Sequence, residues 1–190
     1  METTPEPADG IRDIVDADVL KAFTHPLRNR LYDLLAVDGP ATVSMLAERA
    51  GVAIGSVSHH LGILARAGLV IEAPELARDA REHWWQRAQR GVRWSSSGLA
   101  DPAARTVADS LESQMLQEQH DRARRWLAER DARPEWSEVA FAHQSRLWLS
   151  PAELAELDEA IVALVRSYSG RDHDGREAVL LWARAFPNRP

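Results

Sequence analysis

Apolar positions in the first half of the chain recur at intervals of three and four residues and predict a series of short helices. One such stripe follows Pro26 and comprises Leu27, Leu31, Leu34 and Leu35. Residues spaced in this way lie on one face of an α-helix. The same spacing predicts helices over residues 17–23, 43–50 and 54–67. Residues 69–72 and 82–89 are short segments that predict two strands.

The second half of the chain carries one long helical pattern and one shorter one. The long pattern covers residues 101–129. The shorter begins at Ser150-Pro151-Ala152-Glu153, which is typical of a capping box with Pro at the first helical position. Residues 138–149 and 178–186 are rich in β-branched, aromatic and other apolar residues and predict a strand on each side of this helix.

Length and composition indicate a soluble globular protein. The chain has 190 residues, of which 45% are hydrophobic and 27% charged. We expect an α+β fold, mainly α. It has a disordered acidic N-terminus (1–15), a first domain (16–95), and a C-terminal region (99–190) with a long helix and a strand–helix–strand unit. No apolar run approaches the roughly 18 residues that cross a bilayer, and the N-terminus lacks the pattern of a secretory signal.

Several classes of chemistry have no support in the sequence. The chain contains no cysteine, which excludes disulfides, thiol nucleophiles and cysteine-based metal sites. No nucleophile elbow, Gly-rich phosphate loop or His-Glu-x-x-His motif occurs. We therefore expect a cytoplasmic protein that is not an enzyme and uses no cofactor.

Charge is distributed unevenly along the chain. The net charge is −6, yet residues 17–98 hold ten Lys or Arg and eight Asp or Glu, a net +2. The field near a binding surface matters more for docking on phosphates than the global sum does. The first domain is therefore the part of the chain suited to double-stranded DNA.

The order of elements in the first domain is that of a helix-turn-helix followed by a hairpin. Residues 45–50, Gly51 and residues 54–67 supply the short helix, the turn and the second helix. The outward face of the second helix carries small polar residues and a histidine: Gly55, Ser56, Ser58 and His59. Such a face can lie deep in the major groove. Arg78 and Arg81 lie at the predicted hairpin tip, within reach of the next minor groove or its phosphates.

Two segments carry a resemblance to a known family. FTHPLRNRLYDLL and GVAIGSVSHHLGILARAGLV, followed by a strand pair that ends near Trp85, resemble the ArsR-type winged helix-turn-helix regulators of bacteria. The resemblance implies a homodimer that binds an imperfect palindrome, represses transcription and is released by an effector. It also implies that Ser56, Ser58 and His59 face DNA.

The start of the second helix departs from the family pattern. Ala53 stands where a Ser cap is usual, and Ile54 and Gly55 stand where Gln and Ser are frequent. Ile54 is suited to contact a thymine methyl group, and Gly55 to let the backbone approach the bases. The alternative is that the altered start weakens binding or makes it less sequence-specific.

Metal sensing finds little support. Family members that sense metals use cysteines or paired Asp, His and Glu residues on a C-terminal helix. The long helix offers only Asp109, Glu112, His120 and Asp121. We expect no metal site.

The long helix and the tryptophans suggest roles for the C-terminal region. Val107, Leu111 and Met115 form a narrow apolar stripe, which suits a dimer seam. Four of the seven tryptophans lie in this region: Trp126, Trp136, Trp148 and Trp182. They either fill a small core or line a pocket for a small apolar effector.

The sequence thus predicts a homodimeric DNA-binding regulator, a repressor at a pseudo-palindromic operator. The alternative is a winged-helix module that docks on another protein. Salt separates the two hypotheses, because binding to DNA weakens steeply as salt rises and an apolar protein interface does not.

Overall fold

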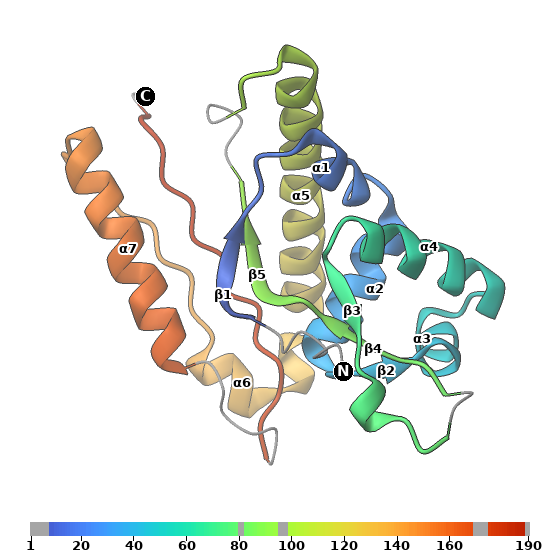
Figure 1. The fold of residues 1–190 in the computed structure, drawn as a ribbon. Coiled ribbons are helices and arrows are strands. Elements are labelled where there is room, and N and C mark those ends of the chain that lie inside the picture. Colours follow the sequence, from blue (N-terminus) through green and yellow to red (C-terminus); the bar gives the residue numbers. More distant parts are fainter. Residues whose placement is uncertain (1–7, 80–81, 95–98, 169–174, 189–190) are drawn as a thin grey trace. The chain divides into compact units, whose positions relative to one another are not determined.

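The computed structural model describes residues 8–79, 82–94, 99–168 and 175–188 (Figure 1). The chain divides into a first unit, Met1–Arg130, and a second unit, Asp131–Pro190. No helix in the described residues combines the length and the apolar character that a membrane span requires. The fold is mostly helical with a small sheet, as the sequence predicts.

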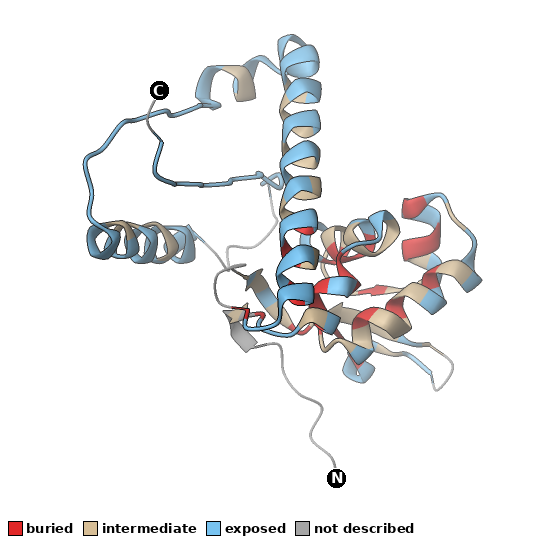
Figure 2. Cartoon of the chain, turned by 90° about the horizontal axis from the view of Figure 1, so that it is seen from above, coloured by how far each residue is buried: buried red, intermediate tan, exposed pale blue. Residues whose placement is uncertain are grey.

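The described part of the first unit contains five α-helices (Figure 1). They are α1 (Ala17–Ala22), α2 (Pro26–Val37), α3 (Val43–Ala50), α4 (Ile54–Arg66) and α5 (Pro102–Glu129). Their apolar faces meet in one core, whose most deeply buried leucines are Leu20, Leu31, Leu46, Leu61, Leu64, Leu69 and Leu111. Figure 2 shows that buried positions concentrate in this unit. The predicted stripes are therefore the faces that pack together.

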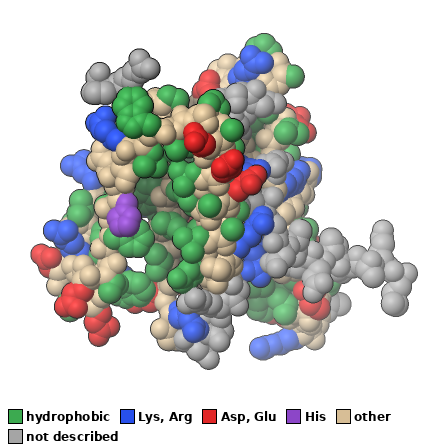
Figure 3. All heavy atoms as spheres, turned by 90° about the vertical axis from the view of Figure 1, so that its left-hand side faces the viewer, with side chains coloured by type: hydrophobic (Ala, Val, Ile, Leu, Met, Phe, Trp, Pro, Cys, Tyr) green, Lys and Arg blue, Asp and Glu red, His purple; other side chains and the backbone are tan. Residues whose placement is uncertain are grey.

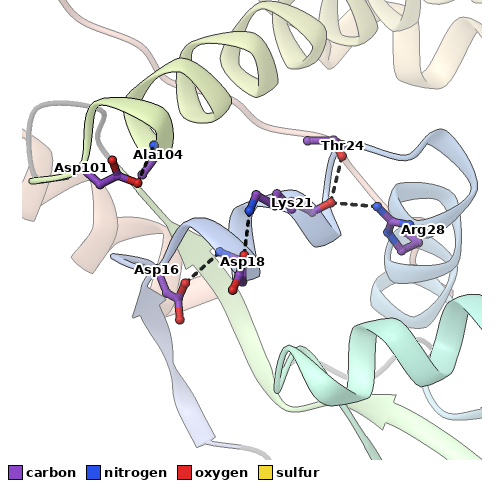
Figure 4. Close-up of polar contacts among 7 residues, drawn as sticks. All are labelled: Asp16, Asp18, Lys21, Thr24, Arg28, Asp101 and Ala104. Carbon is purple, nitrogen blue, oxygen red and sulfur yellow. Dashed lines mark hydrogen bonds and ion pairs between the residues drawn. The ribbon is translucent and has the colours of Figure 1, made fainter.

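Polar residues placed just before the helices explain where the helices begin. The Asp16 carboxylate accepts a hydrogen bond from the Asp18 N–H at 2.8 Å, and Asp101 caps α5 in the same way through Ala103 and Ala104 (Figure 4). His25 Nδ1 accepts from the Leu27 N–H at 3.1 Å, ahead of Pro26 at the first position of α2. Such caps satisfy N–H groups that have no partner inside the helix.

A three-stranded antiparallel sheet lies beside the helices. Its strands are β2 (Ala41–Thr42), β3 (Val70–Glu72) and β4 (Trp84–Arg87), in the order β2-β4-β3. Val70 pairs with Arg87 and Glu72 with Trp85. The loop from β3 to β4 contains the 3₁₀ turn η1 (Pro74–Leu76). The hairpin β3–β4 is the wing that the sequence predicts.

The N-terminal segment corrects one prediction. Residues 8–13 belong to the stretch expected to be disordered, but they form strand β1 (Ala8–Asp13), parallel to β5 (Gln89–Arg93). Arg12 also donates to the carbonyls of Ala67 and Gly68, at 3.2 and 3.0 Å. The pairing joins residues about eighty positions apart, so acidic and Pro-rich local composition could not reveal it. Residues 1–7 lie outside the described residues.

Helix α5 packs on α1 within the first unit. Ala104, Ala108 and Leu111 are buried there, and the guanidinium of Arg122 pairs with the carboxylate of Asp33 on α2. The sequence grouped this helix with the C-terminal region from residue 99. Its contacts place it with the helix-turn-helix instead, because its apolar stripe completes that core. The predicted boundary at 95–98 lies outside the described residues.

Where the structure describes it, the second unit contains two α-helices and two irregular segments. After the 3₁₀ turn η3 (Arg130–Ala132) come α6 (Pro134–Val139) and α7 (Pro151–Tyr168). The predicted capping box is present, since the Ser150 N–H donates to Glu153 Oε2 at 2.7 Å and the Glu153 N–H donates to Ser150 Oγ at 3.3 Å. Gly170, the residue that the sequence predicts to end this helix, lies outside the described residues.

Neither strand predicted for the second unit is present. The end of α6 occupies residues 138–139, and residues 140–150 and 176–188 have no regular secondary structure. Composition makes a segment fit for a strand, but a strand also needs a neighbour for its N–H and C=O groups. The described part of this unit provides no such neighbour.

Candidate nucleic-acid interface

The turn between α3 and α4 is held by local hydrogen bonds. Gly51 has φ 65°, the left-handed conformation that favours glycine. Its N–H donates to the Glu48 carbonyl and the Val52 N–H donates to the Ala47 carbonyl, both at 3.1 Å. The chain can therefore reverse within three residues and begin α4 at once.

Helix α4 has one buried face and one open face. Val57, Leu61 and Leu64 have no exposed surface. The opposite face presents Ile54, Gly55, Ser58 and His59 to solvent, with Ser56 half-buried beside them. The structure thus brings together on one surface every residue of α4 that the sequence assigned to DNA contact.

The beginning of α4 is open. Ala53 provides no side-chain cap, and the first helical N–H groups therefore have no side-chain acceptor in the chain itself. A Cβ atom built on Gly55 would meet no atom within 4 Å. Helix N-termini attract phosphate and other anions through such N–H groups. The missing cap leaves this end of α4 available to an external partner.

Three histidines meet beside the open face. The rings of His25 and His60 lie 4.4 Å apart between centroids, and those of His59 and His60 lie 5.2 Å apart. Burial, together with the nearby His25, Arg28 and His59, lowers the pKa of His60. His25 lies just before α2 and His60 lies on α4. The sequence did not reveal that they touch, because 34 residues separate them.

Arg28 holds in place the segment of chain that carries His25. Its Nε donates to the Ala22 carbonyl and its terminal nitrogen donates to the Lys21 carbonyl at 2.8 Å (Figure 4). Lys21 in turn pairs with Asp18 at 2.8 Å. The end of α1 and the start of α2 are thus tied together, and His25 sits between them.

The wing is less basic than the sequence suggested. Arg78 is exposed, and its backbone N–H donates to Glu82 Oε2 at 2.9 Å. This hydrogen bond is the main cause of the lowered pKa of Glu82. Acidic residues Glu72, Glu75 and Asp79 lie on the same hairpin. Arg81 lies outside the described residues.

The predicted dimer seam is already partly covered. Leu111 is only 1% exposed, buried in the core of its own chain. Val107 and Met115 are half-buried against the same core. A seam between copies would therefore use the flanks of the stripe and not its centre.

The four tryptophans of the predicted effector pocket have different surroundings. Trp126 belongs to the first unit and the other three to the second. Trp136 Nε1 donates to Glu177 Oε1 at 3.0 Å, and Arg133 lies 5.9 Å from its ring centroid. Trp148 is 96% exposed and Trp182 is 43% exposed. The effector stays a prediction from the sequence.

In the described ranges, no three side chains among His, Asp and Glu are grouped so that they could hold one metal ion. His120 Nδ1 lies 3.6 Å from an oxygen of its neighbour Asp121. The expectation of no metal site stays a prediction.

The segment that contains α3 and α4 matches a known protein family. Residues 23–73 match a family described as "Helix-turn-helix domain". These residues are a helix-turn-helix domain. The matched range includes α2, α3, α4 and β3, and the structure adds the hairpin β3–β4, which makes the domain a winged one. No curated protein matched the chain.

Three solved structures illustrate the likeness of the winged helix-turn-helix domain to known proteins. The homodimeric winged helix-turn-helix DNA-binding domain of Mb0332 from Mycobacterium bovis, a possible ArsR-family regulator, shares 25% identity over 55% of this chain and 79% of its own, with a TM-score of 0.35. Rv0081 of Mycobacterium tuberculosis shares 23% over 56% and 91%, with a TM-score of 0.35. The transcriptional repressor BigR of Xylella fastidiosa shares 23% over 51% and 82%, with a TM-score of 0.32.

Proposed function

We propose that the protein is a DNA-binding transcriptional regulator in which α4 enters the major groove. The observation that carries the proposal is the open face of α4 with Gly55, Ser58 and His59, held outward by the buried Val57 and Leu61. Ser and His side chains donate to or accept from base edges and phosphates. Ile54, 56% exposed, provides an apolar contact for a thymine methyl group.

The regulator acts as a homodimer at a pseudo-palindromic operator. Two copies of α4 must lie about 34 Å apart to enter successive major grooves. Val107 and Met115 on α5, with the exposed Leu116 beside them, provide the apolar contacts of a seam. A dimer bound across a promoter excludes polymerase, and the outcome is repression.

The wing makes a supporting contact. Arg78 and Arg81 reach phosphates next to the groove that α4 occupies, and phosphate contacts set position without reading sequence. Because acidic residues share the hairpin, we expect the wing to add less affinity than α4 does.

A footprint on the DNA upstream of the protein's own coding region, repeated at two salt concentrations, tests the proposal. The expected result is a protected, two-fold-related sequence of about two helical turns that weakens as salt rises. Diffuse protection lost in modest salt at every sequence would reject site-specific binding.

The acidic wing favours one second candidate, a winged-helix module that docks on a protein. Glu72, Glu75 and Asp79 are exposed there and would repel phosphates while attracting a basic partner. In that case removal of Arg78 leaves binding to DNA unchanged, and added DNA does not alter hydrogen exchange in α4.

A further inference from the structure

Many large apolar side chains in the described part of the second unit are exposed to solvent. None of the described residues of α6 or α7 is buried. From residue 139 onward, thirteen large apolar side chains are exposed, among them Phe141 at 71%, Trp148 at 96% and Phe186 at 65%. Figure 3 shows hydrophobic side chains over much of the face that it presents. Exposed apolar area on this scale marks a contact surface.

The two irregular segments have the residues of strands but no strand partner. Alternate residues of a strand point to the same face of a sheet. As a strand, 139–149 would place Val139, Phe141, Leu147 and Leu149 on one face and Trp148 on the other. As a strand, 178–186 would place Leu180, Trp182 and Phe186 on one face and Val179 and Leu181 on the other. Each segment therefore has apolar side chains for both faces of a sheet, and the described part of the chain does not supply the layers that would cover them.

One polar cluster brings the beginnings of these segments together. Glu177 accepts from Trp136 Nε1 at 3.0 Å and pairs with the guanidinium of Arg133. Trp136 precedes the first segment and Glu177 precedes the second. The two segments therefore begin close together, one before α7 in the sequence and one after it. A two-stranded sheet with one helix is marginal by itself.

We propose that residues 139–149 and 178–186 of two copies of this chain form one shared β-sheet, covered by α7 of each copy. This deepens the homodimer of the proposed function. The area suffices, because stable interfaces bury about 800 Å² per partner and thirteen exposed large apolar side chains provide an area of that order. Each copy offers both components, an apolar helix stripe and two strands, as a two-fold interface requires.

The charges of α7 and of the two segments favour a second copy of this chain as the partner that covers them. Helix α7 carries Glu153, Glu156, Asp158 and Glu159 against the single Arg166, a net −3. The segments 139–149 and 178–186 contain one arginine each, Arg146 and Arg184, and no acid. The helix of one copy therefore meets segments of opposite charge on the other.

The test uses the full-length chain and the variant Trp148→Arg, with Val15→Arg as control. Val15 is 73% exposed in the first unit, so both changes place a charge on an open apolar site. By analytical ultracentrifugation we expect the wild type and V15R to dimerise and W148R to dissociate at concentrations at least ten times higher. Buried aromatic anchors dominate interfaces. Circular dichroism of W148R serves as the folding control and should show an unchanged helix content.

Hydrogen exchange by mass spectrometry gives the second readout. Amides of 139–149 and 178–186 should be protected in the dimer and exchange freely in W148R. Protection in a monomer would mean that the chain covers these segments itself, and the proposal fails. A W148R dimer as tight as wild type places the contact elsewhere, for example on α5. That outcome overturns the shared sheet and leaves the regulator function standing, because DNA binding by W148R would persist.

Discussion

His60 of helix α4 packs its ring against that of His25, which caps helix α2, with 4.4 Å between the ring centroids. Nδ1 of His25 accepts a hydrogen bond from the Leu27 N–H. His60 Nδ1 is buried and has no hydrogen-bond partner among the described residues. The contact therefore joins the open face of α4 to the start of α2.

The lowered pKa of His60 predicts that the free energy of unfolding falls as the medium turns acidic. The folded state lowers the pKa of His60, so the unfolded chain binds more protons once pH falls through the ordinary histidine value of about 6.5. The stability that the neutral His60 contributes is fully present above that pH. It is lost progressively as the pH falls toward the lowered pKa of His60 in the folded state. Melting temperatures from pH 8 to pH 5 measure the effect.

His60→Gln should flatten this pH dependence, because a neutral amide replaces the titrating ring. His120→Gln is the control, since its side chain is exposed on α5. An unchanged pH profile in H60Q would show that other groups cause the acid sensitivity.

Gly55→Ala should separate stability from DNA binding. A Cβ at this position meets nothing within 4 Å, and alanine in a helix is about 1 kcal/mol more favourable than glycine. We expect greater resistance to urea but weaker binding to DNA, because the methyl group would stand where the backbone approaches the bases.

Gly62→Ala is the matched control for the same helix. It lies two turns, about 10 Å, further along α4, and a Cβ there would meet only Arg66 Nη1, at an ordinary van der Waals distance of 3.9 Å. Equal losses of DNA affinity in G55A and G62A would contradict a contact centred on the first turn.

Gly51→Ala should destabilise the domain although nothing blocks the new methyl group. The space around Gly51 is open, but its φ of 65° costs a residue with a Cβ about 1 kcal/mol. Urea unfolding should therefore shift in the direction opposite to that of G55A. A neutral result would mean that the turn rearranges when glycine is replaced.

Leu111→Ala tests whether α5 belongs to the first unit. The side chain is 1% exposed in that core, and truncation of a buried leucine costs about 3 kcal/mol. Leu116→Ala, at a position 45% exposed, should cost well under half as much. Chemical denaturation followed by circular dichroism compares the two. Equal costs would indicate that Leu111 is not part of the core of the monomer.

The sequence predicted elements whose signals are local. Pro26, Gly51 and Ser150-Pro151 each act through hydrogen bonds or backbone preferences a few residues away, and each begins or ends a helix where expected. The open face of α4 followed from the same periodicity, since buried Val57 and Leu61 determine which residues point outward.

The sequence did not reveal contacts between residues that lie far apart along the chain. Strand β1 depends on β5, and the contact of His25 with His60 depends on how α2 and α4 pack. The stripe on α5 was visible, but its partner was not, so Leu111 was assigned to a second chain although it is buried in its own. The segments 138–149 and 178–186 were predicted as strands from composition alone, which says nothing about a neighbour.

Selection of bound duplexes from a random DNA library by the full-length protein tests the central claim, that the open face of α4 reads DNA. The wild type should enrich a two-fold-related sequence with half-sites one helical turn apart, and His59→Ala should bind that sequence less tightly at the same salt concentration. If the wild type enriches no sequence, or if H59A enriches the same one with equal affinity, α4 does not read DNA as proposed.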